Sequence, residues 1–208
     1  MTIAQGTVGP TPASVGTTPA GGFQQGHDSE LVTADFHGRY YTAAYNGRLY
    51  MASSGSVAPG TALATTAQAL LLFNPAGSGV NLEVVKCSVG LISATAYGAG
   101  YYVYAGVASA IPTGTKLAVS NGLVGNAATG VGQAWTGATP TAPVQLRASG
   151  LSLLPFTGSS VLTPPPLIEE LAGEFVVIPG TVFAFTFIGG AGTAPLANHS
   201  ISWIESKI

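Results

Sequence analysis

Charged side chains are scarce in this chain: Asp, Glu, Lys and Arg make up 7% of its 208 residues, where an ordinary soluble domain has about 25%. A free globule needs charged side chains over its surface to stay dispersed, whereas a subunit covered by its neighbours does not. Nothing charged precedes Asp28, and long uncharged tracts follow between Cys87 and Thr115, between Leu117 and Leu146, and between Ala148 and Ile168. This deficit predicts a part of an assembly.

Composition also argues against several partners. Gly, Ser, Thr and Pro interrupt the apolar residues, and no run approaches the roughly 18 consecutive apolar residues of a membrane-spanning helix. The formal net charge of -2 supplies no basic field for phosphates, so we expect neither a nucleic-acid nor a membrane partner. The first residues, Met1 to Gln5, lack the features of a secretory signal. The single cysteine, Cys87, leaves no internal disulfide, and we expect it to be a small buried hydrophobe.

Residues 1–38 differ from the rest. They repeat Gly, Pro and Thr without strand or helix periodicity, which is typical of a segment that cannot bury enough apolar surface to fold alone. We therefore expect an extended N-terminal arm at 1–38, held by a neighbouring subunit, and a single domain at 39–208.

The first half of the domain carries strand and turn signals. Two β-prone runs, 39–45 and 48–52, flank Asn46-Gly47, which predicts a hairpin with a type I′ turn. A short apolar strand at 69–73 ends in the turn 74–79, which contains Pro and two glycines. The next run, 81–94, places Val85, Cys87, Val89 and Leu91 on one face.

The second half continues in the same way. Further strands are expected at 101–107, 144–154, 181–188 and 199–206, with Ile201 and Trp203 together in the last and Pro179-Gly180 as a type II turn. One short helix is expected at 167–173, because Pro precedes it, acids open it and Gly follows it. The pattern predicts an all-β chain, an antiparallel β-sandwich of jelly-roll type rather than a barrel or propeller.

Two polar clusters could carry chemistry. Two histidines and three carboxylates near the end of the arm could hold a metal ion, but a solvated or intersubunit segment fits their place better: His27, Asp28, Glu30, Asp35 and His37. Glu169, Glu170 and Glu174 could imitate a paired-carboxylate site, yet their place at a helix start explains them more simply. Catalytic and phosphate-binding motifs are missing, so we predict no catalytic residue, no metal and no cofactor.

Aromatic side chains are the other candidates for function. Tyrosines are concentrated in the first half, where they could stack on sugars or partner proteins, or pack across strands within the sandwich. The phenylalanines of 181–187 share one face. The predicted partner-binding residues are Phe23, Tyr40, Tyr41, Tyr101, Tyr102, Tyr104, Phe183 and Phe185.

Two stretches carry a resemblance. Residues 69–84 form a strand, an Asn-Pro-Ala-Gly-Ser-Gly turn and a strand, and residues 167–173 lead to Val177-Ile178-Pro179-Gly180-Thr181 and a closing strand at 201–205. The pattern, over roughly residues 40–208, resembles structural proteins of tailed bacteriophages. The resemblance implies a virion component on a jelly-roll-like sandwich, often trimeric, with no catalytic residues to carry over. The arm is not part of it.

These observations favour one function over two others. We expect a capsid cement or decoration subunit that clamps neighbouring major capsid proteins through its body and arm, and that associates as a trimer through strands 101–107 and 181–187. A tail or fibre protein that contacts the host surface through exposed Tyr residues and loops such as 122–137 is the alternative. An enzyme would need a concave pocket with perturbed titratable groups, for example around Asp35 and His37.

Overall fold

The computed structural model describes residues 38–58, 69–93, 96–97, 100–108, 112–140, 143–152, 156–157, 167–189 and 196–208. The chain divides into two units, Met1–Tyr41 and Thr42–Ile208. Residues 1–37 of the predicted arm, which include the possible metal ligands, lie outside the described residues. The domain boundary after residue 38 therefore stays a prediction.

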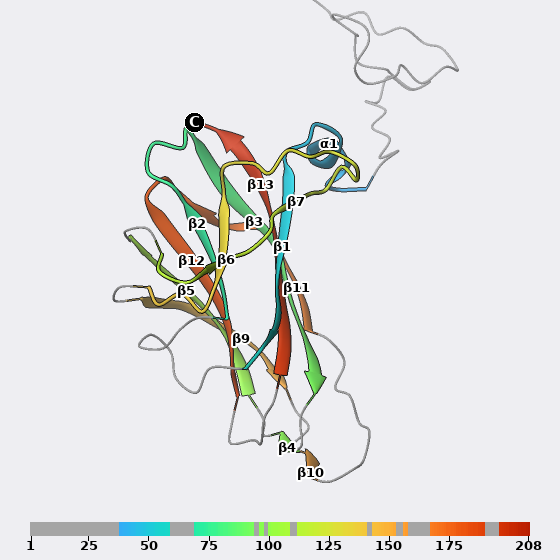
Figure 1. The fold of residues 1–208 in the computed structure, drawn as a ribbon, viewed down its shortest axis with the longest axis vertical. Coiled ribbons are helices and arrows are strands. Elements are labelled where there is room, and N and C mark those ends of the chain that lie inside the picture. Colours follow the sequence, from blue (N-terminus) through green and yellow to red (C-terminus); the bar gives the residue numbers. More distant parts are fainter. Residues whose placement is uncertain are drawn as a thin grey trace, which may run out of the picture. The chain divides into compact units, whose positions relative to one another are not determined.

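The described residues form strands and one short helix (Figure 1). The helix is α1 (Tyr41–Tyr45). The strands are β1 (Leu49–Val57), β2 (Leu70–Asn74), β3 (Val80–Ser93), β4 (Ala96–Tyr97), β5 (Gly100–Ala108), β6 (Thr115–Lys116), β7 (Ser120–Asn121), β8 (Gln133–Thr136), β9 (Val144–Ser152), β10 (Phe156–Thr157), β11 (Leu167–Val177), β12 (Thr181–Gly189) and β13 (Leu196–Lys207). Over the described residues, the structure is mostly β-strand in two antiparallel sheets, which confirms the predicted β class there.

Most strands belong to two antiparallel sheets. The first sheet has the order β11-β3-β13-β1-β7, the second has the order β6-β8-β2-β12-β5-β9, and β4 pairs with β10 separately. Along the chain, β1, β3, β11 and β13 lie in the first sheet, whereas β2, β5, β9 and β12 lie in the second. The edges of the first sheet are β11 and β7, and those of the second are β6 and β9.

One hydrophobic cluster joins the two sheets. The first sheet contributes Trp203 and Ile201 of β13, which are together as predicted, and the second contributes Leu70 and Leu72 of β2 and Phe185 of β12. Each of these side chains is at most 2% exposed. Burial of apolar surface on this scale is the main force that holds such a domain together.

The predicted hairpin around Asn46-Gly47 is wrong, because residues 41–45 are helical. The amide of Arg48 donates to the carbonyl of Ala43 (2.8 Å), and the amide of Gly47 donates to that of Ala44 (2.9 Å). This is the Schellman pattern, in which a residue with positive φ ends a helix. Gly47 has a φ of 66°, so the positive φ that Asn46-Gly47 predicts is correct. It ends a helix, however, instead of forming the turn of a hairpin.

The predicted helix at 167–173 is also wrong. Residues 167–170 pair with β3 in antiparallel register, with Glu169 opposite Cys87 and Glu170 opposite Lys86. Burial alternates along the whole of β11, although its register with β3 shifts at a bulge where Ala172 and Gly173 have φ values of 54° and 88°. Cross-strand partners and an inward-facing Leu171 outweigh the weak helix signals.

In β3 the predicted face changes partway along the strand. Cys87 and Val89 belong to the shared cluster, but so do Leu82 and Val84, whereas Val85 is buried outside it. A register shift opposite Ser202 and Trp203 of β13 causes this, since one extra residue reverses the alternation. The side chain of Leu91 lies outside the described part of the structure.

The predicted turns at 74–79 and 178–181 are confirmed, and Asn74 joins them. Gly77 and Gly79 have positive φ in the first turn, as Gly180 has in the second. The side-chain amide of Asn74 donates to the carbonyls of Val80 and Val177, both at 2.8 Å, and the backbone carbonyl of Asn74 accepts from the amide of Gly180 (2.8 Å). One buried amide thus fixes β2, β3 and β11 together.

Candidate functional site

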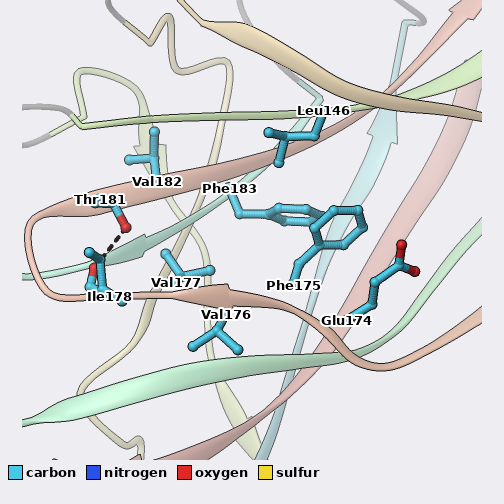
Figure 2. Close-up of a pocket in the computed structure, with 9 residues that line it drawn as sticks. All are labelled: Leu146, Glu174, Phe175, Val176, Val177, Ile178, Thr181, Val182 and Phe183. Atoms are coloured by element: carbon cyan, nitrogen blue, oxygen red, sulfur yellow. Dashed lines mark hydrogen bonds between the residues drawn. The ribbon is translucent and has the colours of Figure 1, made fainter.

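An apolar groove opens where the two sheets end side by side. Its volume is about 280 Å³, and its lining comes from β9, β11, β12 and the turn between the last two: Leu146, Glu174, Phe175, Val176, Val177, Ile178, Thr181, Val182 and Phe183. In Figure 2, Leu146 faces the paired rings of Phe175 and Phe183, while Glu174 lies at one end and Ile178 and Thr181 at the other. This volume is near or below the low end for small-molecule pockets, so it suits one or two aliphatic side chains.

The groove is floored by an aromatic pair from the two sheets. The ring of Phe175 on β11 and that of Phe183 on β12 lie 5.2 Å apart between centroids, tilted by 37°. Phe183 is 2% exposed, and Phe175 is half-buried against the shared cluster. The pair makes the floor rigid and apolar.

Arg147 of β9 bridges the sheets beside the groove. Its guanidinium donates to the carboxylate of Glu174 at 2.6 and 2.7 Å, and it also contacts the carboxylate of Glu169. The same guanidinium lies 5.5 Å from the centroid of the Phe175 ring. The β11 bulge at Ala172 and Gly173 separates the two carboxylates along the strand. One cation therefore holds β9 against β11 at two points.

Apolar side chains continue along the edge strands beyond the groove. Val144 and Leu146 on β9 are 62% and 49% exposed, and Ile168, Val176 and Ile178 on or just after β11 are 60%, 48% and 54% exposed. Such rows on edge strands are unusual for a free monomer, because edges invite pairing with other chains. We call these five residues the edge rows.

The side chains that line the groove are better suited to binding than to catalysis. Its polar side chains are Glu174, which pairs with Arg147, and Thr181, whose hydroxyl donates to the carbonyl of Ile178 at 2.7 Å. Neither is arranged as a nucleophile with an adjacent base. The groove can desolvate an apolar group and orient it beside a charged rim.

The bridge of Arg147 gives a stability prediction. Replacing Arg147 by Met should lower the free energy of unfolding by ~2 kcal/mol, because Glu169, whose side chain is 21% exposed, loses its cation partner. Lys86→Met is the matched control, since Lys86 and Glu170 form a more exposed pair (40% and 49%) at 2.8 Å and should cost less than about 0.5 kcal/mol. Urea unfolding of both variants checks this. Equal losses would show that the Arg147 bridge adds nothing beyond a surface pair.

The predicted partner-binding residues fall into three groups. Phe23 lies outside the described residues, as do the side chains of Tyr101, Tyr102 and Tyr104, whose backbone forms β5. Tyr40 is half-buried and Tyr41 is 42% exposed. Phe183 and Phe185 are 2% and 0% exposed in the shared cluster.

The burial of Phe183 and Phe185 corrects their predicted role. Phe183 and Phe185 of β12 pack in the cluster with residues of β3 and β13, so they face the first sheet rather than a partner. β12 therefore does not offer its aromatic face to a trimer contact. Cys87, by contrast, is buried as predicted, and burial followed by the nearby Glu169 raises the pKa of its thiol.

Sequence reasoning missed Leu146 and Phe175, which line the groove with Phe183, and it missed Arg147 beside the groove. Their contacts join segments about 30 residues apart, β9 to β11 and β12. The one usable signal was the alternation of Val144, Leu146 and Ala148 in a strand with a single charge.

Comparisons with protein-family models, with curated proteins and with solved structures find no match to this chain. Within the described residues, no three or more His, Cys, Asp and Glu side chains come together as a metal site would require. The helix of the described part is too short to span a membrane.

Proposed function

We propose that the chain is a non-enzymatic structural subunit of a phage virion, a capsid cement or decoration protein that clamps neighbouring capsid proteins. The observation that carries the proposal is the pair of edge rows on β9 and β11. In a chain with 7% charged residues, exposed apolar side chains such as Val144 and Ile168 favour a surface that neighbours cover.

We also propose that the body is a jelly-roll sandwich. A jelly roll has eight strands in two sheets; in chain order, strands 1, 8, 3 and 6 form one sheet and strands 2, 7, 4 and 5 the other. The order β1-β13-β3-β11 and the order β2-β12-β5-β9 follow this scheme when β1, β2, β3, β5, β9, β11, β12 and β13 are taken as the eight. The short strands β6, β7 and β8 then belong to an insertion between the fourth and fifth strands.

In this mechanism the two parts of the chain act differently. The sandwich is a rigid body whose edge rows lie against neighbouring subunits, and the arm adds contact area across a junction between capsid proteins. Each contact of the arm has to offset the entropy lost on ordering it. The expected partners are the major capsid protein and further copies of this chain.

Deletion of residues 1–30 tests the clamping role of the arm. The full chain should bind to purified shells that lack it, and the deleted chain should bind more weakly, by about tenfold or more if the arm contributes 1.4 kcal/mol. Co-sedimentation with shells measures both, and a variant with the same number of residues appended to the C-terminus controls for length. Unchanged binding by the deleted chain would contradict the arm's role.

A tail or fibre protein that contacts the host surface is the second candidate. The loop after β7 favours it, because Asn121 and Glu205 accept hydrogen bonds from backbone amides of this loop, and exposed loops on a rigid sandwich often carry recognition. The two candidates differ in copy number: a cement is present in hundreds of copies per particle and a tail component in a handful.

A further inference from the structure

The turn after β7 carries an exposed apolar pair, Leu123 and Val124, which we call the knob. Val124 is 97% exposed and Leu123 is 38% exposed. Gly122 precedes them and Gly125, with a φ of 92°, follows. The side chain of Val124 gains no burial from its own fold, whereas a partner would bury it together with Leu123.

Hydrogen bonds hold the knob in one conformation. Asn121 accepts from the amide of Leu123 and donates to the carbonyl of Gly47, both at 2.8 Å. The amide of Asn126 closes the turn on the carbonyl of Leu123 (2.9 Å). Farther along, the Glu205 carboxylate accepts from the amides of Val131 and Gly132, both at 2.8 Å. A fixed apolar tip loses little entropy on binding.

The knob and the groove lie at opposite edges of the first sheet. β7 pairs with β1 at one edge, and β11 forms the other edge beyond β3. Across five strands this separation is about 19 Å, at ~4.8 Å per strand. The knob of a chain therefore does not reach its own groove, but it can reach the groove of a second copy placed edge to edge.

The charges of the two sides are complementary. The side of β9 and β11 carries Glu169, Glu170 and Glu174 against Arg147 and Lys86. On the other side, β6 and β7 are separated by only three residues, and the exposed charges described there are Lys116 and Arg48. An acidic groove side thus faces a basic knob side when two copies meet edge to edge.

We propose that the knob of one copy occupies the groove of the next copy, so that Leu123 and Val124 pack against Leu146, Phe175 and Ile178. Such a contact is heterologous, with different surfaces on the two partners, and it closes into a ring when the rotation between copies allows. The groove volume of about 280 Å³ fits the two aliphatic side chains. This contact replaces β5 and β12 as the interface of the expected trimer. It deepens the self-association in the proposed function and does not depend on the virion role.

Mixing two variants of the full chain tests the contact. Val124→Asp removes the knob and Leu146→Asp removes the groove, and both positions are exposed, so folding should survive, as circular dichroism would verify. Sedimentation at micromolar concentration should show a closed oligomer for the wild type and monomers for each variant, with the dissociation constant raised about 30-fold or more, as for an interface hot spot. An equimolar mixture should form a 1:1 dimer, because one intact knob meets one intact groove.

Matched controls lie beside each position. Ala127→Asp changes an exposed position in the same loop, and Gln145→Asp changes an exposed position on the same strand, outside both the groove and the edge rows; both should keep the wild-type oligomer. A monomeric wild type, a variant that keeps the wild-type distribution, or a mixture that stays monomeric would each overturn the proposal. If Leu146→Asp unfolds, Ile178→Ser takes its place with the same expectations. None of these outcomes involves virion particles, so failure here is distinct from failure of the virion role.

Discussion

Replacing Phe185 by alanine should lower the free energy of unfolding by ~4 kcal/mol. The ring is 0% exposed and packs in the cluster that joins the two sheets, with its edge contact to His199 at 5.7 Å between centroids. Removing it loses the transfer free energy of the ring and leaves a cavity between sheets that cannot close fully. A typical domain has only about 5–15 kcal/mol of stability, so this single change takes a large fraction. Equilibrium unfolding in urea measures it.

Tyr45→Ala serves as the control, because Tyr45 is an aromatic residue that is 65% exposed. Its replacement should cost less than about 1 kcal/mol. This pair of variants also separates the two roles considered for Phe185. If Phe185→Ala kept the stability of the wild type and lost only self-association, the ring would belong to an interface and its assignment to the core would be wrong.

The second large effect is on pH dependence. His199 of β13 is 0% exposed, and burial lowers its pKa from 6.5 to about 4. The folded chain therefore keeps this imidazole neutral where the unfolded chain already binds a proton. The neutral His199 contributes fully to the free energy of unfolding above about pH 6.5. This contribution is lost as the pH falls toward 4, and it does not change further below that pH. The total is ~3 kcal/mol, at 1.36 kcal/mol per pKa unit.

A His199→Leu variant isolates this contribution from that of the carboxylates. Urea unfolding at several pH values between about 4 and 7 should show a decline for the wild type that exceeds the decline for the variant by ~3 kcal/mol. Carboxylates titrate in both proteins, so their effect cancels in the difference. Parallel declines would mean that His199 is not buried in its neutral form.

The sequence predicted the parts of the fold that depend on local chemistry. The turn at 74–79 and Pro179-Gly180 were correct because glycine with positive φ is required there and few other residues supply it. β13 was correct because its alternation runs without interruption from Ala197 to Glu205. In both cases short-range geometry and burial lead to the same conclusion.

The errors occurred where tertiary contacts decide between two local readings. Asn46-Gly47 supplies the same positive φ to a hairpin and to a helix end, so the preceding residues decide, and Tyr41–Tyr45 fold as a helix. At 167–173 the acids fit a helix start, but on a strand adjacent carboxylates point to opposite faces. Glu169 then pairs with Arg147 beside the groove, while Glu170 pairs with Lys86 on the outer face.

The candidate site was less predictable than the fold. An aromatic run on a strand is equally compatible with a core and with an interface, and only the contacts with the first sheet show that Phe183 and Phe185 are interior. The groove depends on two sheet edges meeting, which no single segment encodes. The knob at Leu123-Val124 looks like an ordinary loop until its exposure is known.

Copy number per particle tests the virion role most directly. Quantitative mass spectrometry of intact, purified particles of a phage that encodes this chain would measure the copy number of the chain relative to that of the major capsid protein. We predict hundreds of copies per particle, as a cement requires to cover its shell. A handful of copies would assign the chain to the tail, and its absence from washed particles would contradict a structural role in the virion.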